Sequence, residues 1–156
     1  MRRFFVVVAL TGCGAQPAGP ALTFDACTPI AVSAIGATAD QRASIDDALV
    51  MWRSAGVAAT VRDASPDITI AFRDAAAAEY GFYDDTSATI YVNVGLTDRA
   101  QRAITVAHEL GHAFALVHVP PDERASVMNP GNLVVAPTVG DTAALAALWG
   151  ACPTSP

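Results

Sequence analysis

The sequence predicts a single domain of the α+β class, and three observations support this fold class. The chain has 156 residues, enough for one domain with a buried core. Short segments typical of β-strands occur between residues 30 and 93. Longer segments in residues 38–56, 97–115 and 141–150 repeat apolar side chains with the period of an α-helix. No internal repeat is visible, so we expect the strands and three main helices to share one core.

The amino-terminal residues are typical of an export signal. A basic start and the apolar run of residues 4–10 precede Thr11-Gly12-Cys13. Leu10 to Cys13 resembles a bacterial lipobox, in which the chain is cut before the cysteine and the cysteine is lipidated. The resemblance implies a signal peptide over residues 1–12 and a lipid anchor on Cys13 in the bacterial cell envelope. An ordinary secretory signal or a misassigned start is the alternative, and either signal exports the protein.

Composition limits the partners of this chain. The chain has nine basic residues, all of them arginine, and 15 acidic residues, so its net charge is -6. This charge argues against nucleic acid as a partner. No stretch reaches the roughly 20 apolar residues that a membrane helix needs, so we expect contact with a membrane only through the lipid anchor. We also expect a monomer.

Two cysteines remain for the exported chain after Cys13 is set aside. Residues 13–26 are rich in glycine and proline and are expected to form a tether, with the folded domain over residues 27–156. Cys27 and Cys152 lie near the two ends of that domain, and an exported chain with one such pair most simply forms a disulfide. Closing so long a loop stabilises the fold by about 4 to 5 kcal/mol in the chain-entropy model.

The first predicted elements are a strand and an amphipathic helix. Residues 30–35 alternate apolar and small side chains, and Gly36 ends the strand. Thr38 and Gln41 have the spacing of a capping box at a helix start. The apolar stripe of this helix consists of Ile45, Ala48, Leu49 and Trp52, and Gly56 ends it.

Four further strands are expected before the second helix. Residues 57–62 and 67–72 are strand candidates separated by a turn, and residues 80–83 and 88–93 are typical of a hairpin. Its loop contains Asp84 and Asp85, which could bind calcium. We favour a solvated turn, because no further acidic ligands cluster nearby.

The second helix carries the chemically informative residues. Thr97 or Asp98 is its expected cap, and apolar side chains on nearly all sides predict a buried helix. His108 and His112 are one helical turn apart, so two imidazoles can converge on one cation, and Glu109 lies close enough to reach a metal-bound water. The last helix is expected to follow Asp141, with Leu145, Leu148 and Trp149 as its packing stripe and Gly150 at its end.

A catalytic zinc site needs three protein ligands and one open position, so a third ligand must come from outside this helix. His118 is the leading candidate, and Asp122 or Glu123 could compete with it. On an unbroken helix His118 would lie about 15 Å along the axis from His108. The helix must therefore end near Ala115 if His118 is to reach the same ion.

The pattern His108-Glu109-x-x-His112-x-x-Ala115-x-x-His118, followed by Ser126-Val127-Met128-Asn129-Pro130, resembles the metzincin metalloproteases and is most similar to the matrixins. The resemblance extends over residues 29–150. It implies a zincin-like fold with a twisted, mixed, five-stranded sheet and three main helices. It also implies a Met-turn at Met128 beneath the zinc, and an edge strand near residues 80–83 that pairs with an extended peptide.

The resemblance implies a zinc-dependent endopeptidase, in which Glu109 activates a zinc-bound water that attacks the peptide bond of an extended peptide or protein substrate. A catalytically silent, exported peptide-binding domain of the same fold is the alternative. Because related proenzymes use an inhibitory cysteine, Cys27 is also a less favoured candidate zinc ligand.

The chain departs from the family at two places. Metzincins usually have glycine where this chain has Ala115, since the helix ends there in a left-handed conformation. Alanine costs on the order of 1 kcal/mol at such a position. In addition, no tyrosine closely follows Met128, so no tyrosine ligand is carried over, and residues 129–137 leave the cleavage specificity open.

Overall fold

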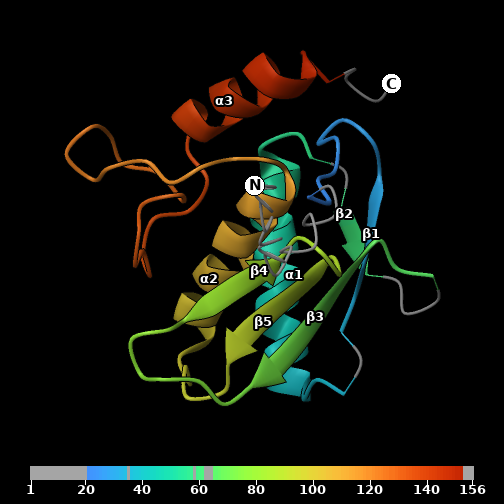
Figure 1. Cartoon of the computed structure of the whole chain (residues 1–156), viewed down its shortest axis with the longest axis vertical. Helices are drawn as coiled ribbons and strands as arrows, with labels where there is room; N and C mark the ends of the chain where they lie inside the picture. Colours follow the sequence, from blue (N-terminus) through green and yellow to red (C-terminus); the bar gives the residue numbers. More distant parts are fainter. Residues whose placement is uncertain (1–20, 35, 58, 62–64, 153–156) are drawn as a thin grey trace, which may run out of the picture.

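The computed structural model describes residues 21–34, 36–57, 59–61 and 65–152. The predicted signal peptide and Cys13 lie outside these residues. Within the described part, no helix is long and apolar enough to cross a membrane. Strands and three helices form an α+β arrangement, as the sequence predicts (Figure 1).

The sheet is mixed, and its strand order places β4 at one edge. The strands are β1 (Ile30–Ser33), β2 (Ala59–Val61), β3 (Ile68–Arg73), β4 (Gly81–Asp84) and β5 (Thr89–Asn93). Their order across the sheet is β2-β1-β3-β5-β4. The pairings of β1 with β2, β1 with β3 and β3 with β5 are parallel, whereas β4 pairs with β5 in antiparallel register, Phe82 opposite Tyr91. The predicted hairpin and the predicted antiparallel edge near residues 80–83 are therefore both present.

The helices α1 (Ala39–Ser54) and α2 (Arg99–Ala113) pack side by side against one face of the sheet (Figure 1). Thr38 and Gln41 form the predicted capping box of α1, and Asp98 caps α2. The indole of Trp52 joins the two helices, because its Nε1 donates to the carbonyl of Ala107 at 2.9 Å and its ring meets Phe114 edge to face at 5.4 Å between centroids. This contact fixes α2, and hence its histidines, relative to α1.

The third helix, α3, spans Val139–Trp149 and lies at one end of the molecule (Figure 1). It begins two residues before Asp141, because Thr138 is its cap and Asp141 is the third helical residue. Leu145 is buried as predicted, but Leu148 is 52% exposed. The predicted packing stripe is thus wrong at Leu148. Trp149 packs against the core as predicted and donates from Nε1 to the carbonyl of Phe114 at 2.9 Å.

The disulfide joins Cys27 to Cys152 as predicted. It links the start of the domain to the segment after α3, and it removes Cys27 as a free thiol that could ligate a metal. Residues 22–26, which the sequence assigns to the tether, pack against the domain in this structure. Phe24 donates its backbone N–H to the carbonyl of Ala113 at 2.8 Å, and Ala26 is fully buried.

Candidate metal centre

Helix α2 ends at a tight turn that brings the chain back toward its own histidines. The last helical residue is Ala113, and Ala115 has a positive φ of 70°. The N–H of Ala115 bonds to the carbonyl of His112, and the N–H of Leu116 bonds to the carbonyl of Gly111, both at 2.9 Å. These two bonds form a Schellman motif. The expected left-handed turn is therefore made by alanine.

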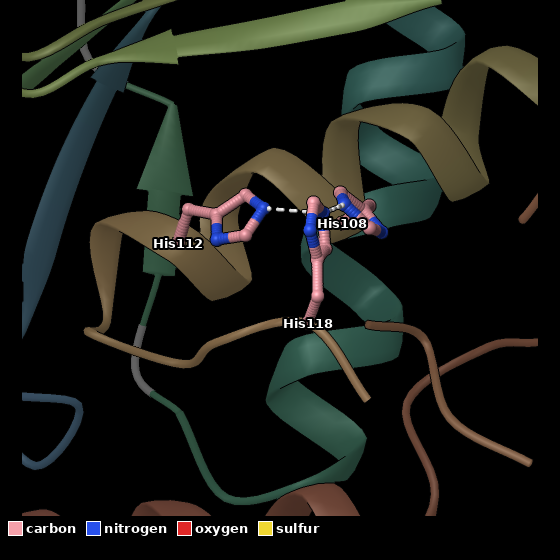
Figure 2. Close-up of side chains that lie close together, drawn as sticks. All are labelled: His108, His112 and His118. Atoms are coloured by element: carbon pink, nitrogen blue, oxygen red, sulfur yellow. Dashed lines mark hydrogen bonds between the residues drawn. The ribbon is translucent and has the colours of Figure 1, made fainter. Parts of the chain in front are cut away.

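The turn places three imidazoles around one point, as Figure 2 shows. The Nε2 atom of His118 lies 3.1 Å from Nε2 of His108 and 3.2 Å from Nε2 of His112. The three possible ligand atoms lie within 4.8 Å of one another. In the described part of the chain this is the one such group of histidine, cysteine and acidic side chains, and it includes neither Asp122 nor Glu123.

Hydrogen bonds at the opposite ring nitrogens orient two of the imidazoles. Nδ1 of His108 lies 2.7 Å from the carbonyl of Val127, and Nδ1 of His112 lies 2.9 Å from the carbonyl of Leu116. Because a carbonyl only accepts, each Nδ1 carries the proton and each Nε2 presents a lone pair to the centre. Backbone partners of this kind are typical of histidines that bind metals.

The protonation states of His108 and His112 also favour metal binding. Burial lowers the pKa of His108 to about 4, although the hydrogen bond to Val127 opposes this shift. Burial likewise lowers the pKa of His112. Both imidazoles are then neutral at pH 7, which is the form that ligates a cation. Nitrogens bound to tetrahedral zinc at 2.0–2.1 Å lie about 3.3 Å apart, so the separations of 3.1 and 3.2 Å between His118 and the two helical histidines are compatible with zinc.

Glu109 lies beside this cluster, against the edge strand. Its side chain is buried, and the backbone N–H of Tyr83 in β4 donates to its carboxylate. Burial raises the pKa of Glu109 to about 7, against the effect of that hydrogen bond. A Cβ atom on Gly81 would lie 2.9 Å from Oε1 of Glu109 and 2.7 Å from Cγ2 of Thr105. Gly81 therefore leaves room for this carboxylate, a requirement that no local sequence pattern indicates.

Met128 is buried and packs directly on α2 at Gly111, the residue before His112. A Cβ atom on Gly111 would lie only 2.3 Å from Sδ of Met128, so glycine is required there for the two segments to approach. The carbonyl of Met128 accepts from the N–H of Val119 at 3.0 Å, which ties this segment to the residue after His118. A second hydrogen bond joins the same two segments, because Nδ2 of Asn129 donates to the carbonyl of Val119 at 2.9 Å.

Asp141 supports the same segment from α3, a role that its predicted place at the start of this helix does not reveal. Its fully buried carboxylate accepts from the hydroxyl of Ser126 and, at 3.1 Å, from the N–H of Val127. It also accepts from Arg124 and from Thr138, the cap of α3. Thr138 and Asp141 have capping-box spacing in the sequence, which predicts the local bond but not the contacts with residues 126–127.

Val127 links Asp141 to the candidate metal centre. The N–H of Val127 bonds to Asp141, while its carbonyl orients the ring of His108. Burial alone would raise the pKa of Asp141, but the hydrogen bonds from Ser126, Arg124 and the backbone outweigh it and lower the pKa below its usual value. Asp141 is therefore ionised at neutral pH.

The histidines and Glu109 open into a cleft of about 620 Å³. One wall is the edge strand β4, and the opposite wall is the segment after Met128. Besides the three histidines and Glu109, the cleft is lined by Thr23, Ala78, Glu79, Tyr80, Gly81, Phe82, Tyr83, Asp85, Thr105, Pro130, Gly131 and Asn132.

The acidic hairpin loop has a structural explanation. Asp84 accepts hydrogen bonds from the backbone N–H and hydroxyl of Thr86 and from the hydroxyl of Ser87. Its oxygens are thus engaged within the turn, and Asp84 and Asp85 are absent from the one candidate metal group in the described residues. The interpretation as a turn is favoured over a calcium site.

Three convergent imidazoles, two of them on a His108-Glu109-x-x-His112 helix, define a candidate metal centre of the His-Glu-x-x-His type. No protein-family model matches the chain, and no curated protein matches it. Among solved structures, the chain is similar to a crystal structure of myroilysin, with a TM-score of 0.62 and 16% sequence identity over 86% of this chain and 88% of that chain. A second structure of myroilysin matches with a TM-score of 0.48 and 20% identity over 62% of this chain and 52% of that chain. The first likeness shows that the two chains share a fold.

Proposed function

We propose that this protein is an exported, zinc-dependent endopeptidase of the metzincin type. One observation carries the proposal: three Nε2 atoms converge in an open cleft beside a buried glutamate on the same helix. A metal held only for structure is normally closed off by four protein ligands, whereas a catalytic zinc keeps a position open. The three-histidine set, the Glu109 carboxylate and the cleft together fit the catalytic arrangement.

His108, His112 and His118 would hold the zinc. When bound, the ion supplies Lewis-acid chemistry, since it polarises a carbonyl and lowers the pKa of water. A dication near Glu109 also favours the ionised carboxylate, which burial alone disfavours. Glu109 then accepts a proton from the attacking water and delivers it to the departing amine. Met128 would form the Met-turn floor, in keeping with its packing against Gly111.

The substrate would be an extended peptide or protein segment that pairs with β4. This strand lines the cleft and is the edge of the sheet, and strand addition at such an edge satisfies backbone groups of both partners. A catalytically silent peptide-binding domain is the alternative function. The buried Glu109 favours the enzyme, because a pure binder gains nothing from burying a carboxylate beside three imidazoles.

Metal analysis tests the metal assignment. We expect one zinc per chain in protein purified after growth with zinc, and loss of peptide hydrolysis on chelation with recovery when zinc is added back. His118→Ala should bind zinc at least about 10-fold more weakly, because one of three protein ligands is lost. Protein that contains no zinc after zinc supplementation would contradict the proposal.

Gly81→Ala tests the placement of Glu109. The new methyl group would meet Oε1 of Glu109 and Cγ2 of Thr105 at less than 3.0 Å, so the carboxylate must shift. We expect kcat to fall about 10- to 100-fold with the zinc content unchanged, since small displacements of a catalytic group cost rates of this order. In the double variant with Thr105→Ser the loss should persist, because the contact with Glu109 remains. Full kcat in Gly81→Ala would show that Glu109 needs no such space.

We also propose that the exported chain is anchored by a lipid on Cys13 and is a monomer. The supporting observation is the lipobox-like sequence that ends at this cysteine. Expressed in a bacterial host, the parent should partition with membranes, and Cys13→Ser should be released in soluble form. Equal partitioning of the two proteins would favour an ordinary secretory signal instead.

A further inference from the structure

The free edge of β4 offers backbone groups at alternate residues. The carbonyl of Tyr80 accepts from the N–H of Asn93 at 2.9 Å, so the backbone groups of Tyr80 face β5, and those of Phe82, two residues further along the strand, face the same way. Since successive residues of a strand direct their backbone groups to opposite sides, Gly81, Tyr83 and Asp85 face the cleft. This is consistent with the N–H of Tyr83 bonding to Glu109.

Part of that edge is already occupied by the chain itself. The N–H of Leu22 donates to the carbonyl of Asp85 at 2.7 Å, and the hydroxyl of Tyr83 donates to the carbonyl of Leu22 at 2.6 Å. Two residues later, Phe24 bonds to the carbonyl of Ala113, next to the ligand His112. The segment Leu22–Phe24 thus runs from the carboxyl-terminal end of β4 to the end of α2, and Thr23 lines the cleft.

At the amino-terminal end of β4, exposed residues line the cleft. Ala78 and Glu79, which precede β4, line the cleft and are exposed. Among the described residues, no backbone hydrogen bond joins residues 22–24 to this end of the strand. Within residues 21–152 as far as the structure describes them, the chain therefore crosses the cleft at the carboxyl-terminal end of β4 and leaves the other end open.

We propose that residues 22–24, here called the N-terminal cap, limit the substrate on the amino-terminal side of the scissile bond. The inference rests on the proposed function. An extended peptide that pairs antiparallel with β4 has its amino-terminal side at the carboxyl-terminal end of β4, where the cap lies. Tyr83 and Asp85 are two residues apart, about 7 Å along the strand, so the edge beyond Glu109 has room for about two or three substrate residues.

The substrate class follows from this asymmetry. On this proposal the endopeptidase prefers scissile bonds within about three residues of a free amino terminus, and within longer chains it cuts where the preceding segment turns away from the cleft. Affinity comes mainly from residues on the carboxyl-terminal side of the scissile bond, which lie along the open end near Glu79.

A series of peptides of increasing length tests whether the N-terminal cap limits the substrate. The peptides share one cleavable core sequence and carry one, two, three, four or six residues before the scissile bond. With the full chain, we expect kcat/KM to rise up to about three residues and then to fall at least threefold. A steady rise through six residues would overturn the proposal.

Two substitutions and one control assign the effect to the cap. Leu22→Pro removes the N–H that bonds to Asp85, and Tyr83→Phe removes the hydroxyl that bonds to Leu22. Both should move the optimum toward longer amino-terminal extensions. Ala21→Pro, the same change one residue earlier, keeps both bonds and should leave the length profile as in the parent. Unchanged profiles in Leu22→Pro and Tyr83→Phe would contradict the cap.

Binding measurements separate the cap from the catalytic proposal. Affinities of the same peptides for the Glu109→Gln variant depend on cleft length but not on turnover. If affinity falls beyond about three residues, the cap is supported even where no hydrolysis is found. Cleavage with a flat length dependence of both kcat/KM and affinity would overturn the cap and leave the proposed function intact.

Discussion

Replacement of Glu109 by glutamine is expected to lower kcat by about 10²- to 10⁴-fold, the range that general-base catalysis contributes. The amide has the shape of the carboxyl group and can still accept from the N–H of Tyr83. It cannot take a proton from water at neutral pH. The fold should be preserved, because a neutral amide in this buried position carries no charge to desolvate.

Zinc content and peptide affinity should be unchanged in Glu109→Gln, since the three imidazoles that could hold the metal do not include this side chain. The measurement is kcat with metal analysis of the same sample. Glu123→Gln is the matched control, because Glu123 is exposed and lies outside the histidine group. Hydrolysis at the parental rate by Glu109→Gln would rule out the general-base function.

Asp141→Asn is expected to cause the largest loss of stability among single polar substitutions at this site. The carboxylate accepts bonds from Ser126, Val127, Arg124 and Thr138, and an amide can accept only through its one oxygen. Its NH₂ group would face donors, so buried donors lose their partners. We expect the free energy of unfolding to fall by about 3 kcal/mol, in the range for a broken buried network.

Asp141→Asn should also weaken zinc binding. Val127 would be less firmly held, and its carbonyl orients His108. We expect zinc affinity to fall about 10- to 100-fold, as is typical when an indirect support of a metal ligand is removed. Asp46→Asn, on the exposed face of α1, is the control and should change neither quantity. Parental zinc affinity in Asp141→Asn would contradict the link through Val127.

The stability that Asp141 contributes should depend on pH in a defined direction. The fold lowers its pKa below the usual 3.8, so the folded chain binds this proton more weakly than the unfolded chain does. The contribution is therefore complete above about pH 4 and is lost as the pH falls further. Denaturant titrations of metal-free protein should show a steeper loss of stability below pH 4 in the parent than in Asp141→Asn.

Much of the metal centre could be predicted from the sequence because its determinants are local. The spacing of His108 and His112 on one helical face follows from 3.6 residues per turn. The requirement that the helix end before His118 follows from the same geometry, and the Schellman turn at Ala115 confirms it. The capping box at Thr38 and the edge position of residues 80–83 are likewise present.

Other features depended on the tertiary structure, because they join residues that are distant in the chain. Asp141 supports Val127 across 14 residues, and Gly81 leaves space for Glu109 from another element. Leu148 has the helical spacing of a core residue but is exposed, since periodicity defines a face of a helix and not how much of it a partner covers. The sequence alone thus determined the three candidate ligands and the turn that brings them together, through contacts within about ten residues. Only the tertiary structure decided what holds those ligands and how the cleft ends, because these depend on which surfaces meet when the chain packs.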